Sequence, residues 1–290
     1  MATTISKGTM FPEEVVNDLF NKVRGKSSLA VLANQIPVSF VGNKEFTFSM
    51  DDEVNLVGEN EAKAAGQSTV APVTIVPVKV EYGSRVSDEF MNAAEEQQLE
   101  ILKAFNEGFA KKVARGIDIM AFHGVNPRTG SASGLIKTYF DQGSKTVTFT
   151  ASDPGDNVED AVEKLGDNGV SGIAMSRTFA SALAKMKNAL GGNLFPELAW
   201  GGNPEKLNGL DASVNTTVDF GSSTDEAIVG NFREFFKWGF AKDVTMKIIE
   251  YGDPDNTGSD LAGHNQIYIR GEAYVGWAIM DQAAFTRIVE

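Results

Sequence analysis

The sequence predicts an α+β protein with one very long helix and an extended two-stranded hairpin. Residues 88–121 keep an apolar stripe with spacings of three and four, which indicates a helix. Two strand-like runs flank a long polar stretch at residues 51–72, which indicates the hairpin. Beyond residue 122, helical and strand patterns alternate. At 290 residues the chain can form one large domain or two smaller ones.

Composition excludes several classes of protein. The formal net charge of -13 repels phosphate, which argues against a nucleic-acid binder, although a polymer that encloses DNA without gripping it stays open. The absence of cysteine excludes disulfides and thiolate metal sites. The first twenty residues do not match a secretory signal, and no run approaches the ~18 apolar residues of a membrane span.

The N-terminal part of the chain is expected to be an extended lead followed by a helix and a strand. Within residues 1–36, Pro12 suits a first helical turn and Gly25 suits a helix end. From residue 36 to residue 50 the pattern changes to strand, with a turn at Gly42 and Asn43.

The polar stretch 51–72 is rich in small residues and cannot form a core of its own. Residues 73–80 then alternate and are β-branched, so they predict a strand, with Pro77 at an edge or bulge. A two-stranded arm of this kind is marginal alone. It needs a surface to lie on, either its own domain or another subunit.

The helix at 88–121 is the strongest single prediction. Acidic residues gather in its first half and basic residues in its second half, which complements the helix dipole. At 1.5 Å per residue it would be roughly 50 Å long. A glycine-rich connection, residues 122–135, ends it.

The rest of the chain predicts an alternation of short elements. Residues 193–226 are loop-rich around short strands. The other expected elements are strands at 146–150, 172–176, 227–230, 244–251 and 266–278, and helices at 156–169 and 178–190.

No catalytic constellation emerges from the motifs. His123 and His264 both stand beside glycine, without a Ser-His-Asp order or a His-x-x-x-His pair, so a surface or turn role is predicted for each. The acidic run at residues 51–53 fits a solvated loop better than half of a metal or acid–base pair. The glycines of 122–135 follow a helix and form no phosphate loop.

Two further segments have a functional and a structural interpretation. Residues 253–264 place acids near a glycine as a calcium loop does, but Pro254 intrudes and His264 stands where the final Glu belongs, so a hairpin tip is favoured. The aromatic run 231–238 could stack nucleic-acid bases, yet the acidic net charge favours core or interface packing.

The order of these parts resembles the tailed-bacteriophage major capsid protein family, the Hong Kong 97 fold. The segment MFPEEVVNDLFNKVRGKSSLAVLANQIPV is similar to the family's Pro-Glu helix and Ser-Leu run, residues 37–82 to its E-loop, and residues 88–121 to its spine helix. AIVGNFREFFKWGF resembles a family strand, with Asn231 where Asp is usual. Residues 269–278 and Ala284-Phe285 resemble its closing strand and end. The family's Phe-Gly-Pro-Gly-Leu connection is matched, with looser spacing, by Phe122, Gly124, Pro127, Gly134 and Leu135.

The resemblance implies a structural, non-enzymatic protein without cofactor or metal. It implies a Hong Kong 97 capsid fold with a long spine helix, an extended β-hairpin E-loop, a P-domain and an A-domain. Copies would assemble in the host bacterial cytoplasm into hexamers and pentamers of an icosahedral virion shell that encloses double-stranded DNA. The implied division is an N-terminal arm at 1–36, the E-loop at 37–83, the P-domain at 84–121 and 231–273, and the A-domain at 122–230 and 274–290.

We expect the subunit interface first in the polar excursion. The residues singled out there are Asp51, Asp52, Glu53, Glu59, Glu61, Lys63 and Gln67. Portal, scaffold and decoration proteins are the further partners that the resemblance implies. The family's N-terminal scaffolding region is not seen in this sequence, which leaves a separate scaffold, prior cleavage or no scaffold. Lys44 and Lys63 are the only lysines of the E-loop before residue 79, and no catalytic Glu can be assigned, so covalent crosslinking is not expected.

Two alternatives remain open at this point. An encapsulin-type nanocompartment shares the fold but encloses protein cargo, and the Pro-Glu segment favours a phage protein over it. An α+β hydrolase with an unrecognised site is the other alternative. Two histidines, no cysteine and no phosphate loop count against it.

Overall fold

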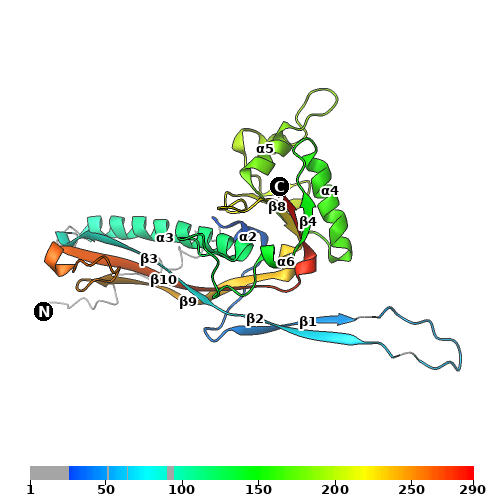
Figure 1. Ribbon diagram of the computed structural model, residues 1–290, viewed down its shortest axis with the longest axis horizontal. Helices are drawn as coiled ribbons and strands as arrows, with labels where there is room; N and C mark the ends of the chain where they lie inside the picture. The colour runs from blue at the N-terminus through cyan, green and yellow to red at the C-terminus, as the bar shows by residue number, and fades with distance from the viewer. Residues whose placement is uncertain (1–25, 51, 64, 90–94) are drawn as a thin grey trace.

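The computed structural model describes residues 26–50, 52–63, 65–89 and 95–290. A long helix lies along a three-stranded sheet, a six-stranded sheet with two helices stands at one end, and a two-stranded arm projects beyond that end (Figure 1). The helix expected near Pro12 falls outside the described residues. Within the described part, no helix is long and apolar enough to cross a membrane.

The long helix is confirmed as α3 (Glu95–His123), which at 1.5 Å per residue measures about 44 Å. Its apolar stripe is buried. The described helix begins later than residue 88, and residues 90–94 lie outside the described part. It ends where expected because Gly124 takes a left-handed φ of 67° and donates its N–H to Met120 O at 3.0 Å. The buried stripe comprises Leu102, Phe109, Val113, Ile117 and Met120.

The sheet beneath α3 is antiparallel. Its order is β3 (Val78–Ser87), β10 (Gln266–Ile279) and β9 (Phe236–Ile249). A Cβ at Gly271 would lie 3.0 Å from the Phe109 ring, so the missing side chain lets the helix approach the central strand.

 Along this strand only Gln266, Arg270 and Tyr274 are half-buried, and the other positions are buried.

The six-stranded sheet has mixed directions. Its order is β4 (Lys145–Thr148), β11 (Phe285–Val289), β8 (Asp225–Gly230), β5 (Gly172–Met175), β7 (Leu210–Val214) and β6 (Lys206–Leu207). The pairs β11–β4 and β5–β7 are parallel and the others are antiparallel. Helices α4 (Pro154–Leu165) and α5 (Arg177–Lys185) pack on it around Phe179, so this end of the molecule has a core of its own.

Asp118 fastens the start of the described chain to α3. It is fully buried, and its carboxylate caps the short helix α2 (Ser28–Leu32). Burial raises the pKa of Asp118 to about 6, although its hydrogen bonds act to lower it. The donors are Ser27 Oγ at 2.5 Å, Ser28 N at 2.9 Å, Leu29 N at 3.2 Å, Thr217 Oγ1 at 3.1 Å and Asn215 Nδ2 at 3.2 Å.

The polar excursion is shorter than predicted, and the following strand is divided. Residues 68–72 belong to β2 (Ser68–Ile75), because each of them pairs with a residue of β1 (Asn43–Met50). The expected strand at 73–80 breaks around Pro77 into β2 and β3, which lie in different sheets. Proline cannot donate to a ladder, so it is suited to this break.

Elements of the C-terminal half also differ in extent. Helix α5 ends at Lys185 instead of residue 190, because the Asn188 side chain accepts hydrogen bonds from Leu190 N and Gly192 N in a turn. Strand β9 begins at Phe236, earlier than residue 244, and takes in part of the aromatic run. Trp238 and Phe232 of that run are buried, which confirms the packing interpretation.

Short elements complete the chain. Strand β11 was not predicted, because five residues at the end of a chain give little pattern and their pairing with β4 and β8 is non-local. α4 begins at Pro154, before the predicted range of 156–169, and ends at Leu165, where the turn η3 follows. The remaining elements are α6 (Phe232–Phe235) and the 3-10 turns η2 (Phe140–Gln142), η3 (Gly166–Asn168), η4 (Pro196–Gly201), η5 (Ala262–His264) and η6 (Gln282–Ala284).

The two histidines have different environments. His264 is exposed in η5, as predicted. The prediction for His123 was wrong: its side chain is only 4% exposed, because the end of α3 points at the six-stranded sheet and brings the ring to Asp141.

Residues 253–264 form the tip that connects the antiparallel strands β9 and β10, which confirms the hairpin interpretation. The Arg85 guanidinium lies among the would-be calcium ligands and donates to Asp253, Asp255 and Thr257. Arg85 lowers the pKa of Asp255 to about 2. A cationic side chain therefore already neutralises these acids.

Candidate assembly interface

The arm formed by β1 and β2 exposes an apolar face. In its antiparallel register Phe46 lies opposite Pro72 and Phe48 lies opposite Val70. Residues that lie opposite one another in such a pair share a face, and so do alternate residues along a strand. Phe46 is 64% exposed, Phe48 60%, Met50 78% and Val70 56%.

The other face of the arm is more polar. It carries Glu45, Thr47 and Ser49, which lie opposite Val73, Ala71 and Thr69. Thr47 Oγ1 donates to Ala71 O at 3.2 Å and so is used within the arm itself. The arm is therefore a ribbon with two unlike faces, and the apolar one is left uncovered by the subunit that makes it.

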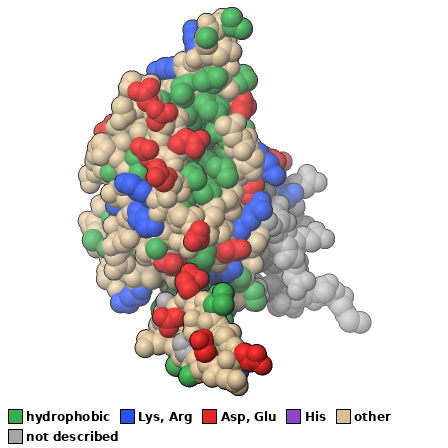
Figure 2. All heavy atoms as spheres, turned by 90° about the vertical axis from the view of Figure 1, so that its right-hand side faces the viewer, with side chains coloured by type: hydrophobic (Ala, Val, Ile, Leu, Met, Phe, Trp, Pro, Cys, Tyr) green, Lys and Arg blue, Asp and Glu red, His purple; other side chains and the backbone are tan. Residues whose placement is uncertain are grey.

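The tip of the arm, residues 52–67, holds the interface residues that the sequence singled out. Asp52 accepts a hydrogen bond from Gln67 N at 2.8 Å, which closes the base of the tip. Glu61 accepts one from Gly58 N at 3.0 Å. Seen end-on in Figure 2, the tip presents several acidic side chains. Asp52, Glu53, Glu59, Glu61, Lys63 and Gln67 are all exposed, and Asp51 lies outside the described residues.

The root of the arm is tightly packed. Ile36 N donates to Trp238 O at 2.8 Å, and Val38 and Ile75 pack with Ala278 in a small core. A Cβ at Gly239 would lie 1.9 Å from Ile36 O, so only glycine allows the two backbones to approach in this way. This root fixes the arm to the three-stranded sheet.

A second exposed apolar set lies in the loops around α5, on the unit built by the six-stranded sheet. Leu190 is 96% exposed, and Trp200 is fully exposed within the η4 turn. Single exposed apolar residues are ordinary, but a fully exposed tryptophan is characteristic of surfaces that bind another protein. This set belongs to the loops around α5.

A basic groove of about 870 Å³ lies between α3, α5 and the edge of the six-stranded sheet. Arg115 at this groove donates to Thr216 Oγ1 at 2.9 Å. The groove contrasts with the acidic tip of the arm. Its basic residues are Lys26, Lys111, Lys112, Arg115, Arg177 and Lys206.

The sequence predicted the arm, but the interface residues it singled out there were charged or polar ones. In the structure the exposed apolar side chains of the arm are those of Phe46 and Phe48, and their alternation along the strand was the signal in the sequence.

The sequence analysis also missed a buried polar cluster around His123. Burial and the neighbouring Asp141 raise the pKa of Asp225 in that cluster. No local spacing reveals this cluster, because its members come from distant parts of the chain.

Comparison with known proteins gives a consistent result. The family model described as "Phage capsid family" matches residues 7–289. A solved chain from Mycobacterium phage Ogopogo is similar at 29% identity and a TM-score of 0.77, with 91% of this chain and 92% of that chain covered. A search of curated proteins finds no match.

Two further solved structures share the fold. A chain from Gordonia phage Cozz has 22% identity and a TM-score of 0.74, with 91% of this chain and 86% of that chain covered. The structure titled "Capsid of native GTA particle computed with C5 symmetry" has 17% identity and a TM-score of 0.67, with coverage of 90% and 89%. These matches do not favour the nanocompartment alternative.

Proposed function

We propose that this chain, which belongs to the phage capsid family, builds its shell by laying the apolar face of its β1–β2 arm on a neighbouring subunit. It is a major capsid protein with the Hong Kong 97 fold, and its place is the capsid of the virion. The observation that carries the arm proposal is the uncovered row of Phe46, Phe48 and Met50 on a ribbon with a packed root.

Energetics support this use of the arm. Burial of one phenylalanine side chain contributes about 1.5 to 3 kcal/mol, so Phe46 and Phe48 together could add roughly 3 to 6 kcal/mol to each contact between subunits. While they stay exposed to water, these two side chains contribute no burial free energy to the subunit. In a shell, another copy of the chain is always present to cover this face of the arm.

The finer assembly is also part of this proposal. We infer hexamers and pentamers that enclose double-stranded DNA, assembled in the bacterial cytoplasm with a portal and, where used, scaffold and decoration proteins. Family membership supports these partners. The exposed Leu190 and Trp200 would contact neighbours around the capsomer axis, far from the arm.

The domain division follows from the sheets. We place the end of the E-loop at Pro77 instead of residue 83, because β3 pairs with β10 from Val78 onward. The three-stranded sheet with α3 would form the P-domain, and the six-stranded sheet with α4 and α5 the A-domain.

The test replaces both phenylalanines. The variant Phe46→Ser with Phe48→Ser should keep the circular-dichroism spectrum and the unfolding midpoint of the natural subunit, because neither side chain is buried in it. Its assembly should need a subunit concentration roughly 100-fold higher, the equivalent of about 3 kcal/mol. Sedimentation and electron microscopy measure shell formation.

The matched control changes the opposite face, with Glu45→Ser and Thr47→Ser in place of the phenylalanines. This variant should assemble as the natural protein does. If the phenylalanine variant forms closed shells at the natural concentration, the arm proposal is wrong, whereas loss of assembly in both variants would indicate general damage to the ribbon.

A further inference from the structure

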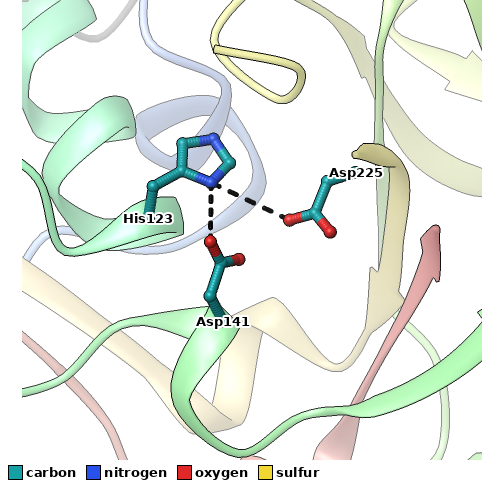
Figure 3. Close-up of side chains that lie close together, drawn as sticks. All are labelled: His123, Asp141 and Asp225. Carbon is teal, nitrogen blue, oxygen red and sulfur yellow. Dashed lines mark hydrogen bonds and ion pairs between the residues drawn. The ribbon is translucent and has the colours of Figure 1, made fainter. Parts of the chain in front are cut away.

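We propose that His123, Asp141 and Asp225 form a binding site for one divalent transition-metal ion, with Zn²⁺ as the expected occupant. The three side chains point toward one another (Figure 3). They come from the last residue of α3, from η2 and from the start of β8. One ligand atom of each lies within 4.8 Å of the others. The ion would join the spine helix to the six-stranded sheet.

The ring of His123 is oriented as a metal ligand. Its Nε2 lies 2.9 Å from Thr217 O, and because a carbonyl oxygen can only accept, Nε2 carries the hydrogen. In the neutral ring Nδ1 is then left with a free lone pair. That lone pair lies 3.0 Å from Asp141 Oδ2 and 3.9 Å from Asp225 Oδ2. Three electron-pair donors therefore converge on one point.

Asp225 supplies the second, independent observation. The residue is fully buried, and within the described part of the chain its Oδ2 has no hydrogen-bond partner. A proton on His123 Nδ1 would bond Asp141 and leave this oxygen unsatisfied, since 3.9 Å is too long for a hydrogen bond. A buried carboxylate oxygen without a partner is costly. A cation between the three groups would satisfy all of them.

The distances suit a small metal ion. Bonds of about 2.0 to 2.2 Å in a tetrahedral site place the ligand atoms roughly 3.3 to 3.6 Å apart. The separations of 3.0 and 3.9 Å from Nδ1 bracket that range, so side-chain shifts of about half an ångström would complete the site. One imidazole with two carboxylates and no thiolate is a donor set for Zn²⁺, Mn²⁺ or Co²⁺.

Arg287 and Thr217 provide the outer contacts that such sites need. Arg287 Nη1 donates to Asp141 Oδ1 at 2.9 Å and to Asp225 Oδ1 at 2.8 Å, so each carboxylate keeps its other oxygen for the ion. The Thr217 carbonyl fixes the ring, as hydrogen-bond acceptors do behind metal-binding histidines. When both carboxyls are ionised, their two charges against one guanidinium leave a charge of minus one, which favours a cation.

The site has an opening and lies apart from the arm. The side chain of Asp141 is 27% exposed, so an ion could enter there and a water molecule could fill the fourth position. Since the ligands belong to three separate segments, bound metal would stabilise the junction between α3 and the six-stranded sheet. The sequence predicted no metal ligand among these three residues.

The test titrates ZnCl₂ into the full chain after treatment with EDTA and dialysis. Isothermal calorimetry should give one Zn²⁺ per chain, and the unfolding midpoint should rise with Zn²⁺ concentration, because an ion that binds the folded state stabilises it. His123→Gln and Asp141→Asn should each weaken binding by at least roughly tenfold. Circular dichroism checks that both variants fold.

His264→Gln is the matched control, because it removes the exposed histidine and leaves the cluster intact. This variant should bind Zn²⁺ as the natural chain does. Absence of saturable binding in the natural chain, or equal binding in the His123→Gln and Asp141→Asn variants, would overturn the proposal. His123 Nδ1 would then carry a proton instead of binding a metal ion.

Discussion

Asp118 illustrates how a single buried carboxyl can hold distant segments together. It caps α2 from near the C-terminal end of α3 and also accepts a hydrogen bond from Thr217, which in turn holds the ring of His123 through its carbonyl. A residue of this kind influences two parts of the structure at once. Its protonation should therefore affect the stability of the subunit.

The free energy of unfolding of the subunit should therefore depend on pH. The pKa of Asp118 rises from 3.8 in the unfolded chain to about 6 in the folded one, so the folded state binds the proton more tightly. Its contribution to stability is fully present below pH 4 and is lost as the pH rises through 6. The whole change is about 3 kcal/mol, from 1.36 kcal/mol per pKa unit.

Urea unfolding of the isolated subunit at pH values between 4 and 7 measures this effect. The variant Asp118→Asn cannot titrate there, and all other groups are shared, so the difference in slope between the two proteins isolates Asp118. The natural subunit should lose more free energy of unfolding over this range than the variant. Parallel curves for the two proteins would refute the prediction.

Residue-scale function was the hardest part to predict from the sequence. His123 stood beside a glycine without any motif, and its partners Asp141 and Asp225 come from other elements. Only the fold brings them together. The acidic tip residues were visible in the sequence because they are adjacent, but adjacency does not say whether they contact a neighbour.

At the scale of elements, the root of the arm depends on close contact between backbones. Gly239→Ala should destabilise the subunit, because the new Cβ would lie 1.9 Å from Ile36 O and 2.9 Å from Val38 Cγ2, and a backbone oxygen cannot move aside cheaply. We expect a loss of about 1 to 3 kcal/mol, the usual cost of overpacking. Urea unfolding measures it.

Gly108→Ala is the control for the Gly239→Ala substitution. Gly108 is exposed within α3 and has open space around its Cβ position. Alanine should stabilise the helix there by about 0.5 to 1 kcal/mol. The two substitutions should thus have opposite signs, and a Gly239→Ala subunit as stable as the natural one would disprove the close-contact argument.

Elements with strong local patterns were predicted best. α3 was predicted from its stripe, and the arm from two strands around a polar stretch. The break at Pro77 and the short strand β11 were less accessible, because which sheet a strand joins depends on partners far along the chain. The sequence placed residues 68–72 in the polar stretch for the same reason, because their strand conformation comes from pairing with β1.

At the scale of the whole molecule, the net charge of -13 is unevenly distributed over the surface. The acidic tip of the arm and the basic groove beside α3 are different surfaces of one subunit. Contacts between unlike surfaces are heterologous, and repeated heterologous contacts close into rings when the rotation allows it. This charge pattern is therefore suited to a ring of identical subunits.

Removing the tip should separate folding from assembly. Met50 and Ser68 are paired across the arm, so residues 51–67 can be replaced by an Asn-Gly turn that keeps the register. We expect a folded subunit with an unchanged unfolding midpoint and few closed shells in electron micrographs.

A second variant distinguishes the sequence of the tip from its length. It replaces residues 51–67 with a Gly/Ser linker of equal length, and it should also fail to assemble if the tip's own side chains make the contact. Unfolding of the subunit after either change would show that the tip belongs to the core instead.

The packing of the arm also sets an order of events during synthesis. β1 and β2 are neighbours in sequence, and a hairpin forms within about 1 to 10 μs. The central strand of the three-stranded sheet, β10, follows some 200 residues later, roughly 10 to 40 s at ribosomal speed. A nascent chain thus displays Phe46 and Phe48 well before it can offer a finished surface to receive them, so translation itself delays contact between copies.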